Sequence, residues 1–225
     1  MAAPSTRSAP RPAAVGTRER VGARHAGNGT EANRRPEIVR VAARLFRERG
    51  FDGTTVRDIA AAVGMRSGSP FYHFASKEEI LFEVMEEGLR QGLARIEAVL
   101  AQHSDPRERF VALMRTHFGT ILEDGNDFVP VMLYEWRRLP PNYRKRLIAV
   151  KDRYDALWQG VLEELAAAGL MRGDVKLARL LILGAVNFTA TWFKRGGKLS
   201  IDELALASAD FFLLPAVETR ARRRG

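Results

Sequence analysis

Residues 54–80, TTVRDIAAAVGMRSGSPFYHFASKEEI, hold the pattern that decides the fold of this chain. They predict a short helix, a turn at Gly64, a second short helix and the start of a longer third one. Thr54 or Thr55 is placed to cap the first helix, and glycine at position 64 accepts the left-handed backbone that ends it. The apolar residues of that helix recur at helical spacing: Val56, Ile59, Ala60 and Val63.

The second short helix is expected over residues 66–74. Small polar residues at its start let the backbone approach phosphate groups, and aromatic residues at its end anchor it to its neighbours. This division favours a helix-turn-helix that enters the major groove of DNA. We expect Tyr72 and Lys77 to contact phosphates. The full set of candidate DNA contacts is Thr54, Thr55, Arg66, Ser67, Gly68, Ser69, Phe71, Tyr72, His73 and Lys77.

The block from about residue 35 to residue 80 resembles the TetR family of bacterial one-component regulators. The family pattern V-x-x-I-A-x-x-x-G, followed by x-Y-x-H-F-x-S-K-E-E-[LI], is matched by Val56, Ile59, Ala60, Gly64, Tyr72, His73, Phe74, Ser76, Lys77, Glu78, Glu79 and Ile80. The family's first helix is matched upstream by Ile38, Val41, Ala42, Leu45 and Phe46. The resemblance implies an all-α fold, with a three-helix N-terminal DNA-binding domain containing the helix-turn-helix and a six-helix C-terminal ligand-binding and dimerisation domain.

Pro70 departs from the family pattern, which usually has leucine at this position. Proline inside a helix lacks an amide donor and clashes with the preceding turn. In the first turn it is tolerated, because an amide there has no intrahelical acceptor. If the second helix begins near Ser67, Pro70 therefore changes how the helix is entered without breaking the fold.

Four segments are expected along the chain. Residues 1–33 are rich in arginine and small residues and predict a disordered basic arm, because they cannot bury enough apolar surface to fold. This arm either follows the DNA backbone or is a solvated leader without a role. Residues 34–80 form the DNA-binding domain, residues 81–219 the ligand-binding and dimerisation domain, and residues 220–225 a basic tail. Of the net charge of +9, most lies in residues 1–74, which hold 13 basic and 6 acidic residues.

The composition also excludes several classes of protein. The chain has no cysteine, which excludes disulfides and cysteine-ligated zinc and fits the cytoplasm. Its most apolar run, residues 177–190, is interrupted by Arg179 and Asn187, so no membrane span is expected. Histidine and acidic residues do not recur at metal-ligand spacing, and no cofactor is predicted. No Ser/His/Asp or paired-carboxylate arrangement indicates an enzyme.

Helices fill the rest of the chain. The capping-box pattern at Ser76 and Glu79 starts a long helix that continues to Leu100. Asp105, Asp127, Pro141, Asp174 and Ser200 mark the starts of five further helices. The last two carry small residues among aromatic ones, which suits packing against the same helices of a second copy. A homodimer is also expected because two recognition helices together read a palindromic operator.

Two blocks in the larger domain suggest its ligand. Residues 133–140 and 184–200 resemble the Y-E-W-R-x-L and G-A-x-N-[WF]-x-x-x-W-[YF] blocks of a TetR branch that controls lipid and steroid catabolism. Several members of that branch respond to acyl-coenzyme A thioesters. The resemblance implies an apolar pocket within residues 105–197 that opens toward Arg137 and Arg195. The candidate ligand residues are Tyr134, Trp136, Arg137, Arg138, Trp158, Asn187, Trp192 and Arg195.

Each ligand assignment has a structural alternative. A stripe of aromatic residues at helical spacing also forms a core, and a basic residue at a helix end is also a solvated charge. Two functions follow from the sequence. The first is a dimeric repressor that a small hydrophobic effector releases from its operator. The second is a helical carrier or enzyme for a hydrophobic thioester, without a DNA-binding role.

Overall fold

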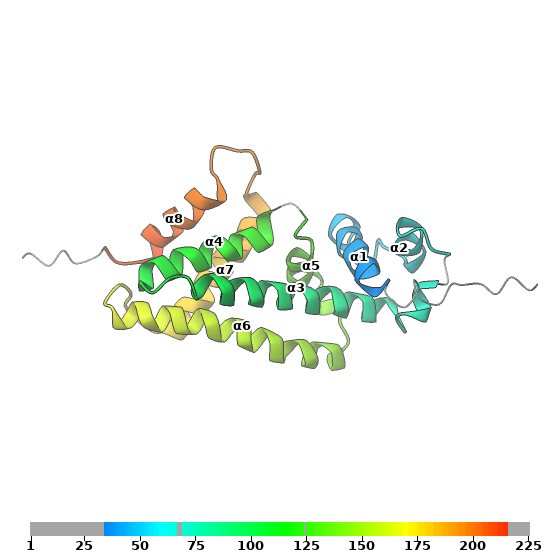
Figure 1. Cartoon of the computed structure of the whole chain (residues 1–225), viewed down its shortest axis with the longest axis horizontal. Helices are drawn as coiled ribbons and strands as arrows, with labels where there is room; N and C mark the ends of the chain where they lie inside the picture. Colours follow the sequence, from blue (N-terminus) through cyan, green and yellow to red (C-terminus); the bar gives the residue numbers. More distant parts are fainter. Residues whose placement is uncertain (1–33, 67–68, 124, 216–225) are drawn as a thin grey trace, which may run out of the picture. The chain divides into compact units, whose positions relative to one another are not determined.

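The computed structural model describes residues 34–66, 69–123 and 125–215. Within these residues it contains eight α-helices, two short 3-10 helices and no strand (Figure 1). The elements in chain order are α1 (Arg35–Arg49), α2 (Val56–Ala62), η1 (Ser69–Tyr72), α3 (Lys77–Leu100), α4 (Pro106–Leu122), α5 (Phe128–Glu135), η2 (Trp136–Arg138), α6 (Pro141–Ala167), α7 (Val175–Trp192) and α8 (Ile201–Phe212). The predicted basic arm and basic tail lie outside the described residues.

The structure decides which threonine caps α2. Thr55 adopts an extended backbone, its side chain accepts from the amide of Asp58, and the Asp58 carboxylate accepts from the Thr55 amide. Such reciprocal bonds satisfy amides that the first helical turn leaves without partners. Thr54 is fully buried instead, and its hydroxyl donates to the carbonyl oxygens of Leu45 at 3.1 Å and Gly50 at 2.9 Å. Gly64 ends the helix with a φ of 66°, as predicted.

The helix expected over residues 66–74 differs from the prediction. In the described part of this segment the backbone forms only the 3-10 helix η1, from Ser69 to Tyr72. The carbonyl oxygen of Pro70 accepts from the amides of His73 at 2.9 Å and Phe74 at 3.0 Å. Proline disfavours the α conformation in the residue before it and contributes no amide donor, which accounts for a single tight turn here. The effect of Pro70 thus extends beyond the helix entry that the sequence suggested.

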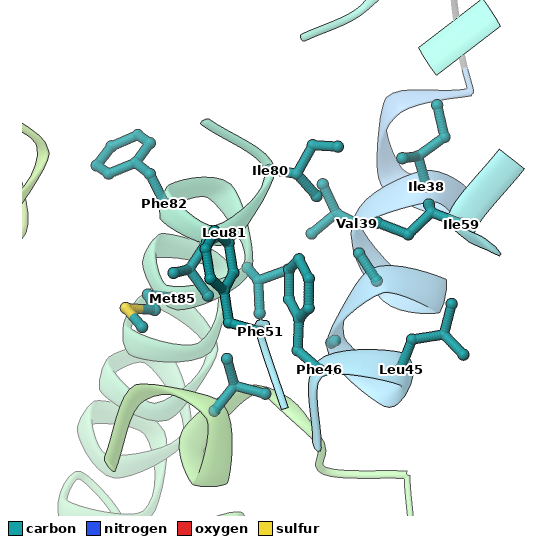
Figure 2. Close-up of a cluster of buried hydrophobic side chains, with 14 of the residues drawn as sticks. Ile38, Val39, Leu45, Phe46, Phe51, Ile59, Ile80, Leu81, Phe82 and Met85 are labelled. Carbon is teal, nitrogen blue, oxygen red and sulfur yellow. The ribbon is translucent and has the colours of Figure 1, made fainter. Parts of the chain in front are cut away.

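Helix α3 packs against both parts of the fold. At its start, Ile80, Leu81 and Met85 join a core with side chains from α1, including Val39 and Phe46. Figure 2 shows Val39 and Phe46 pointing from α1 toward the beginning of α3. Farther along α3, Ile96 and Leu100 join a second core with α4, α6, α7 and α8. Because one continuous helix supplies both cores, a shift of α3 moves side chains in both.

The six helices predicted after residue 76 are all present, with small differences at their ends. Ser76 caps α3 by accepting from the Glu79 amide, but the Glu79 carboxylate accepts from the Ala75 amide at 2.6 Å, not from Ser76 as a full capping box requires. Helix α7 ends at Trp192, ahead of the predicted glycine stop. The 3-10 helix η2, which follows α5, was not expected.

Gly88 allows α3 and α5 to approach closely. A Cβ atom at this position would lie 2.7 Å from the Cβ of Phe128 and 3.3 Å from its carbonyl carbon, so a side chain would push α5 away. Gly160, in α6, has no atom within 4 Å of the same hypothetical Cβ. Both glycines therefore lie within helices, but the space beside Gly88 is filled and the space beside Gly160 is open.

We expect Gly88→Ala to lower the free energy of unfolding by about 1–3 kcal/mol, because the added methyl group overpacks the contact with Phe128 and displaces α5. Gly160→Ala should raise it by up to about 1 kcal/mol, because alanine loses less backbone entropy in a helix. Urea unfolding followed by circular dichroism measures both. Equal urea midpoints for the two variants would show that α5 is not in close steric contact with Gly88.

Candidate functional site

The exposed face of α2 and η1 presents groups that suit DNA. Phe71 and Tyr72 are 55% and 89% exposed, unusually high for aromatic side chains. Thr55, Arg57 and Arg66 are exposed as well. Large exposed aromatic and arginine side chains beside a helix N-terminus fit contacts to phosphates and base edges. Arg57 was missed in the sequence because it lies outside the residues that carry the family pattern.

Three expected DNA contacts have different roles in the structure. Thr54 is buried and bonded inside the fold, so it is not available to DNA. The Lys77 ammonium donates to the carbonyl oxygens of Phe51 at 2.9 Å and Thr54 at 3.0 Å, and it lies 4.0 Å from the centre of the Phe51 ring. His73 is half-buried, and its carbonyl oxygen accepts from Arg35. Lys77 therefore holds the α1–α2 turn in place. Ser67 and Gly68 lie outside the described residues, and Ser69 begins η1.

A largely apolar cavity of about 220 Å³ lies among five helices. Its lining residues come from α3 (Gly88, Leu89, Gly92), α4 (His117, Thr120), α5 (Val129, Met132), α6 (Lys151, Tyr154, Asp155) and α7 (Leu180, Leu183, Asn187). Gly88 and Gly92 are one turn apart on α3, and a Cβ at Gly92 would lie 3.3 Å from the Tyr154 ring. The missing side chains leave the space that the cavity occupies.

One end of the cavity is polar. The hydroxyl of Tyr154 lies 2.5 Å from Nδ1 of His117, and Nε2 of His117 lies 2.9 Å from Oδ1 of Asn187. Burial lowers the pKa of His117 to about 4, with a smaller opposing effect from the bond to Asn187. Burial also raises the pKa of the Tyr154 hydroxyl. Both side chains are therefore neutral near pH 7, and they form hydrogen bonds without a buried charge.

Charged groups occur in the α6 part of the lining. Asp155 accepts from Lys151 at 2.6 Å, and its carboxylate lies 3.5 Å from the guanidinium of Arg179. Lys151 and Leu180 are the exposed members of the lining and mark where the cavity reaches the surface. Lys151 belongs to the lining, and Arg179 lies next to it through its contact with Asp155.

The predicted ligand residues divide into three groups. Asn187 lines the cavity. Trp158 is fully buried behind it, 5.3 Å from the His117 ring in an edge-on contact, and belongs to the core. Tyr134 and Arg195 line a separate cavity of about 230 Å³, together with Arg47 of α1. The remaining four residues line neither cavity: Trp136, Arg137, Arg138 and Trp192.

The predicted opening toward Arg137 and Arg195 therefore needs correction. Arg137 is exposed on η2, and the Arg195 guanidinium donates to the carbonyl oxygens of Leu122 and Glu123. Burial, with a further contribution from Arg47, lowers the pKa of Arg195. The sequence placed basic residues near the ligand because they follow the aromatic blocks. In the fold, Lys151 and Arg179 are the cations beside the apolar cavity.

The sequence predicted Asn187 and missed the other cavity residues, because the lining comes from five different helices. His117 and Asn187 are 70 positions apart, and Tyr154 stands between them in the sequence. The available signal was a polar side chain on an otherwise apolar helix face, as His117 is beside Met114 and Phe118. That signal does not show which residues meet. Among the residues that the structure describes, no three His, Asp or Glu side chains gather as metal ligands would.

Helix α5 joins the cavity to the DNA-binding part. Its residues Val129 and Met132 line the cavity. Just beyond them, the Glu135 carboxylate accepts from the Phe51 amide at 3.0 Å. Asp127, which precedes α5, pairs with Arg47 of α1 at 2.7 Å.

A further ion pair, at 2.5 Å, joins Arg138 of η2 to Asp52 in the α1–α2 turn. Together with the bonds of Asp127 and Glu135, it holds both ends of the α5 segment against α1 and the turn that follows. We call these three contacts the α5 latch.

Helices α7 and α8 expose a large apolar surface. Leu177, Leu180, Leu181, Phe188 and Trp192 of α7 and Leu206 and Phe211 of α8 are each at least half exposed. By length and composition alone, α7 is the one helix in the described residues that could cross a membrane, contrary to the sequence expectation. A helix face with several large exposed apolar side chains usually marks an interaction site.

Tyr72 and Lys77 should respond differently to substitution. Tyr72→Ala should weaken binding to DNA from the chain's own promoter region, with a change in stability below about 0.5 kcal/mol, because the ring is exposed. Lys77→Ala should lower the free energy of unfolding by about 1–3 kcal/mol, because two carbonyl oxygens lose a charged donor. Fluorescence anisotropy and urea unfolding separate the effects. A stable Lys77→Ala variant with a reduced salt dependence would restore Lys77 as a phosphate contact.

Comparison with known proteins agrees with this arrangement. Residues 38–84 match the model of bacterial regulatory proteins of the tetR family, and residues 103–215 match a tetracyclin repressor-like C-terminal domain. The transcriptional repressor KstR2 of Rhodococcus jostii is 33% identical over 178 residues, which cover 78% of this chain and 87% of KstR2.

Two solved structures share the fold. AibR, in complex with isovaleryl coenzyme A and operator DNA, superposes with a TM-score of 0.75 at 27% identity, covering 81% of this chain and 99% of AibR. The superantigen PfiT superposes with a TM-score of 0.71 at 42% identity, covering 80% of this chain and 96% of PfiT. With both halves matched and KstR2 aligned over most of its length, the chain belongs to the TetR family of transcriptional regulators.

Proposed function

We propose that this regulator is a dimeric repressor and that an acyl-coenzyme A thioester releases it from a palindromic operator. The observation that carries the proposal is the cavity whose wall includes α5, since the same helix is latched to the DNA-binding domain. A ligand in that cavity touches the element that positions the helix-turn-helix. The alignment with a repressor and the superposition with a regulator that binds isovaleryl coenzyme A and operator DNA support this choice.

The chemistry of the cavity suits a thioester. Its apolar lining matches an acyl group, which gains about 25 cal/mol for each Å² of apolar surface removed from water. The phosphates of coenzyme A require cations, and Lys151 and Arg179 lie beside the cavity. These two residues take the part that the sequence assigned to Arg137 and Arg195.

The exposed apolar faces of α7 and α8 support the dimer. An operator palindrome is read by two recognition units related by a two-fold axis, and such an axis pairs the same surface of both copies. Burial of the exposed leucine and aromatic side chains of α7 and α8 supplies the driving force. This pairing also gives the apolar surface of α7 a role in a regulator that does not cross a membrane.

Release requires the ligand to favour one conformation. A thioester that binds the released form about a hundredfold more tightly supplies about 3 kcal/mol per site. The α5 latch provides a route, because Met132 faces the cavity and Glu135 holds the Phe51 amide within the same short helix. A ligand that displaces Met132 moves Glu135 and, through it, the turn between α1 and α2.

The direct test is release of operator DNA. We expect the protein to retard DNA from its own promoter region, and isovaleryl- or octanoyl-coenzyme A to reverse this, because the thioester favours the released form. Free coenzyme A and the free acids should be much weaker, since each lacks either the acyl group or the phosphates. Fluorescence anisotropy measures the effect. If no thioester releases the DNA, the effector class is wrong, although the protein remains a DNA-binding regulator.

The latch makes a separate prediction. Glu135→Ala should leave thioester affinity within about threefold of the unmodified protein, because Glu135 does not line the cavity. It should reduce the ratio of operator affinities without and with thioester by at least about fivefold, since the coupling depends on the bond to Phe51. Glu163→Ala, an exposed glutamate of α6 away from the latch, is the matched control. An unchanged ratio would exclude Glu135 from the coupling.

A further inference from the structure

The placement of the Asn187 amide decides which nitrogen of His117 carries the hydrogen. The Oδ1 atom of Asn187 can only accept, so Nε2 of His117, 2.9 Å away, carries the hydrogen. Nδ1 of His117 therefore accepts, and the Tyr154 hydroxyl donates to it at 2.5 Å. Helices α4, α6 and α7 each supply one residue of this series of hydrogen bonds. The result is that Oδ1 is engaged with His117, and the amide nitrogen Nδ2 is left for another partner.

Asn187 lies in the lining of a largely apolar cavity, and its Nδ2 atom has two N–H donors. In the described part of the chain, no hydrogen bond from Nδ2 to a protein acceptor is present. A donor facing an apolar space needs an acceptor from whatever fills it. None of the side chains at the polar end carries a positive charge to accompany a carboxylate, because burial keeps His117 neutral and Tyr154 and Asn187 are uncharged. A neutral carbonyl oxygen fits this position better than a carboxylate does.

The volume of the cavity limits the size of the group beside Asn187. An apolar protein cavity of about 150 Å³ holds benzene. In proportion, the 220 Å³ found here holds about nine non-hydrogen atoms. An octanoyl group is of this size, whereas a palmitoyl group is nearly twice as large and a steroid ring system is larger still.

We propose that the effector carries a short acyl group of octanoyl size or smaller, whose carbonyl oxygen accepts a hydrogen bond from the side-chain amide of Asn187. This rests on the proposed function, since it takes the effector to be an acyl-coenzyme A thioester. Asn187 is then a specificity-determining residue that touches the ligand. His117 and Tyr154 are positioning residues that hold its amide with the nitrogen toward the ligand.

The first experiment uses the unmodified full-length protein and compares coenzyme A derivatives by calorimetric titration. Isovaleryl- and octanoyl-coenzyme A should bind at least tenfold more tightly than palmitoyl-coenzyme A. S-octyl-coenzyme A, a thioether with a methylene in place of the carbonyl, should bind about three- to tenfold more weakly than octanoyl-coenzyme A, because one hydrogen bond is lost. Equal affinity for the thioether, or tighter binding of palmitoyl-coenzyme A, overturns the proposal.

The second experiment substitutes the donor. Asn187→Leu keeps a side chain of similar size without the amide, and it should bind octanoyl-coenzyme A and the thioether equally. Asn187→Asp presents only acceptors and should lose binding of octanoyl-coenzyme A. Leu183→Ala lines the same cavity on the same helix and has no polar atom, so it should keep the preference for the thioester while accepting longer acyl groups. A preference for the thioester that survives in Asn187→Leu overturns the role of Asn187.

A separate variant tests the positioning role of Tyr154. Tyr154→Phe removes the hydroxyl that donates to His117, and it should reduce the thioester-to-thioether preference while retaining the preference for short acyl groups. Retardation of operator DNA shows whether each variant is folded, and the comparison on the unmodified protein needs no variant. If every coenzyme A derivative fails to bind, the proposed effector class fails. If they bind without regard to length or carbonyl, only the present inference fails.

Discussion

Helix α3 is the constraint on which the rest of the structure depends. It begins in the core that α1 forms with the helix-turn-helix and ends in the core of the larger domain. Interiors packed at crystal-like density do not deform continuously, so a helix shared by two cores transmits displacement as a rigid body. In the proposed function, α3 therefore couples the cavity wall at Gly88 and Gly92 to the position of the DNA-binding residues.

Helix α5 provides the second connection, and it is a polar one. It lies against α3 where Gly88 has no side chain, and the latch then joins it to Arg47, Phe51 and Asp52. Ion pairs with exposed partners contribute little stability, typically below about 1 kcal/mol each. In the proposed function, contacts of this strength adjust at little cost when a ligand moves α5. The buried apolar contacts of α3 keep the fold intact while the latch changes.

The polar end of the cavity likewise depends on a few polar contacts inside an apolar core. A histidine buried among Phe110, Trp158 and Phe118 would be unfavourable if it were charged or unpartnered. Both ring nitrogens of His117 are hydrogen-bonded, and burial keeps the ring neutral. In our proposal, this arrangement lets an otherwise apolar cavity distinguish ligands by a single hydrogen bond. Selectivity of this kind exceeds what an apolar wall alone provides, since it leaves a polar group unpaired when the wrong ligand binds.

The sequence by itself determined the all-helical class, the starts of the long helices and the family. These features depend on neighbours in the chain: Thr55 and Asp58, Ser76 and Glu79, and Ser200 and Glu203 are each three residues apart, and apolar residues repeat with the helical period. The sequence also showed Pro70 as a departure from the family pattern. Its neighbours decide whether the segment forms an α-helix or the single 3-10 turn that is present.

Tertiary structure alone decided which side chains meet and which are buried. The sequence predicts DNA contacts for Lys77 and Thr54, but Thr54 is buried within the α1–α2 turn and Lys77 donates to two carbonyl oxygens of that turn. His117, Tyr154 and Asn187 meet because three helices pack with a particular rotation and offset. Packing also explains why the cations beside the cavity are Lys151 and Arg179. The sequence predicted Arg137 and Arg195 there. Helical periodicity fixes the face on which a residue lies, whereas only packing fixes what that face meets.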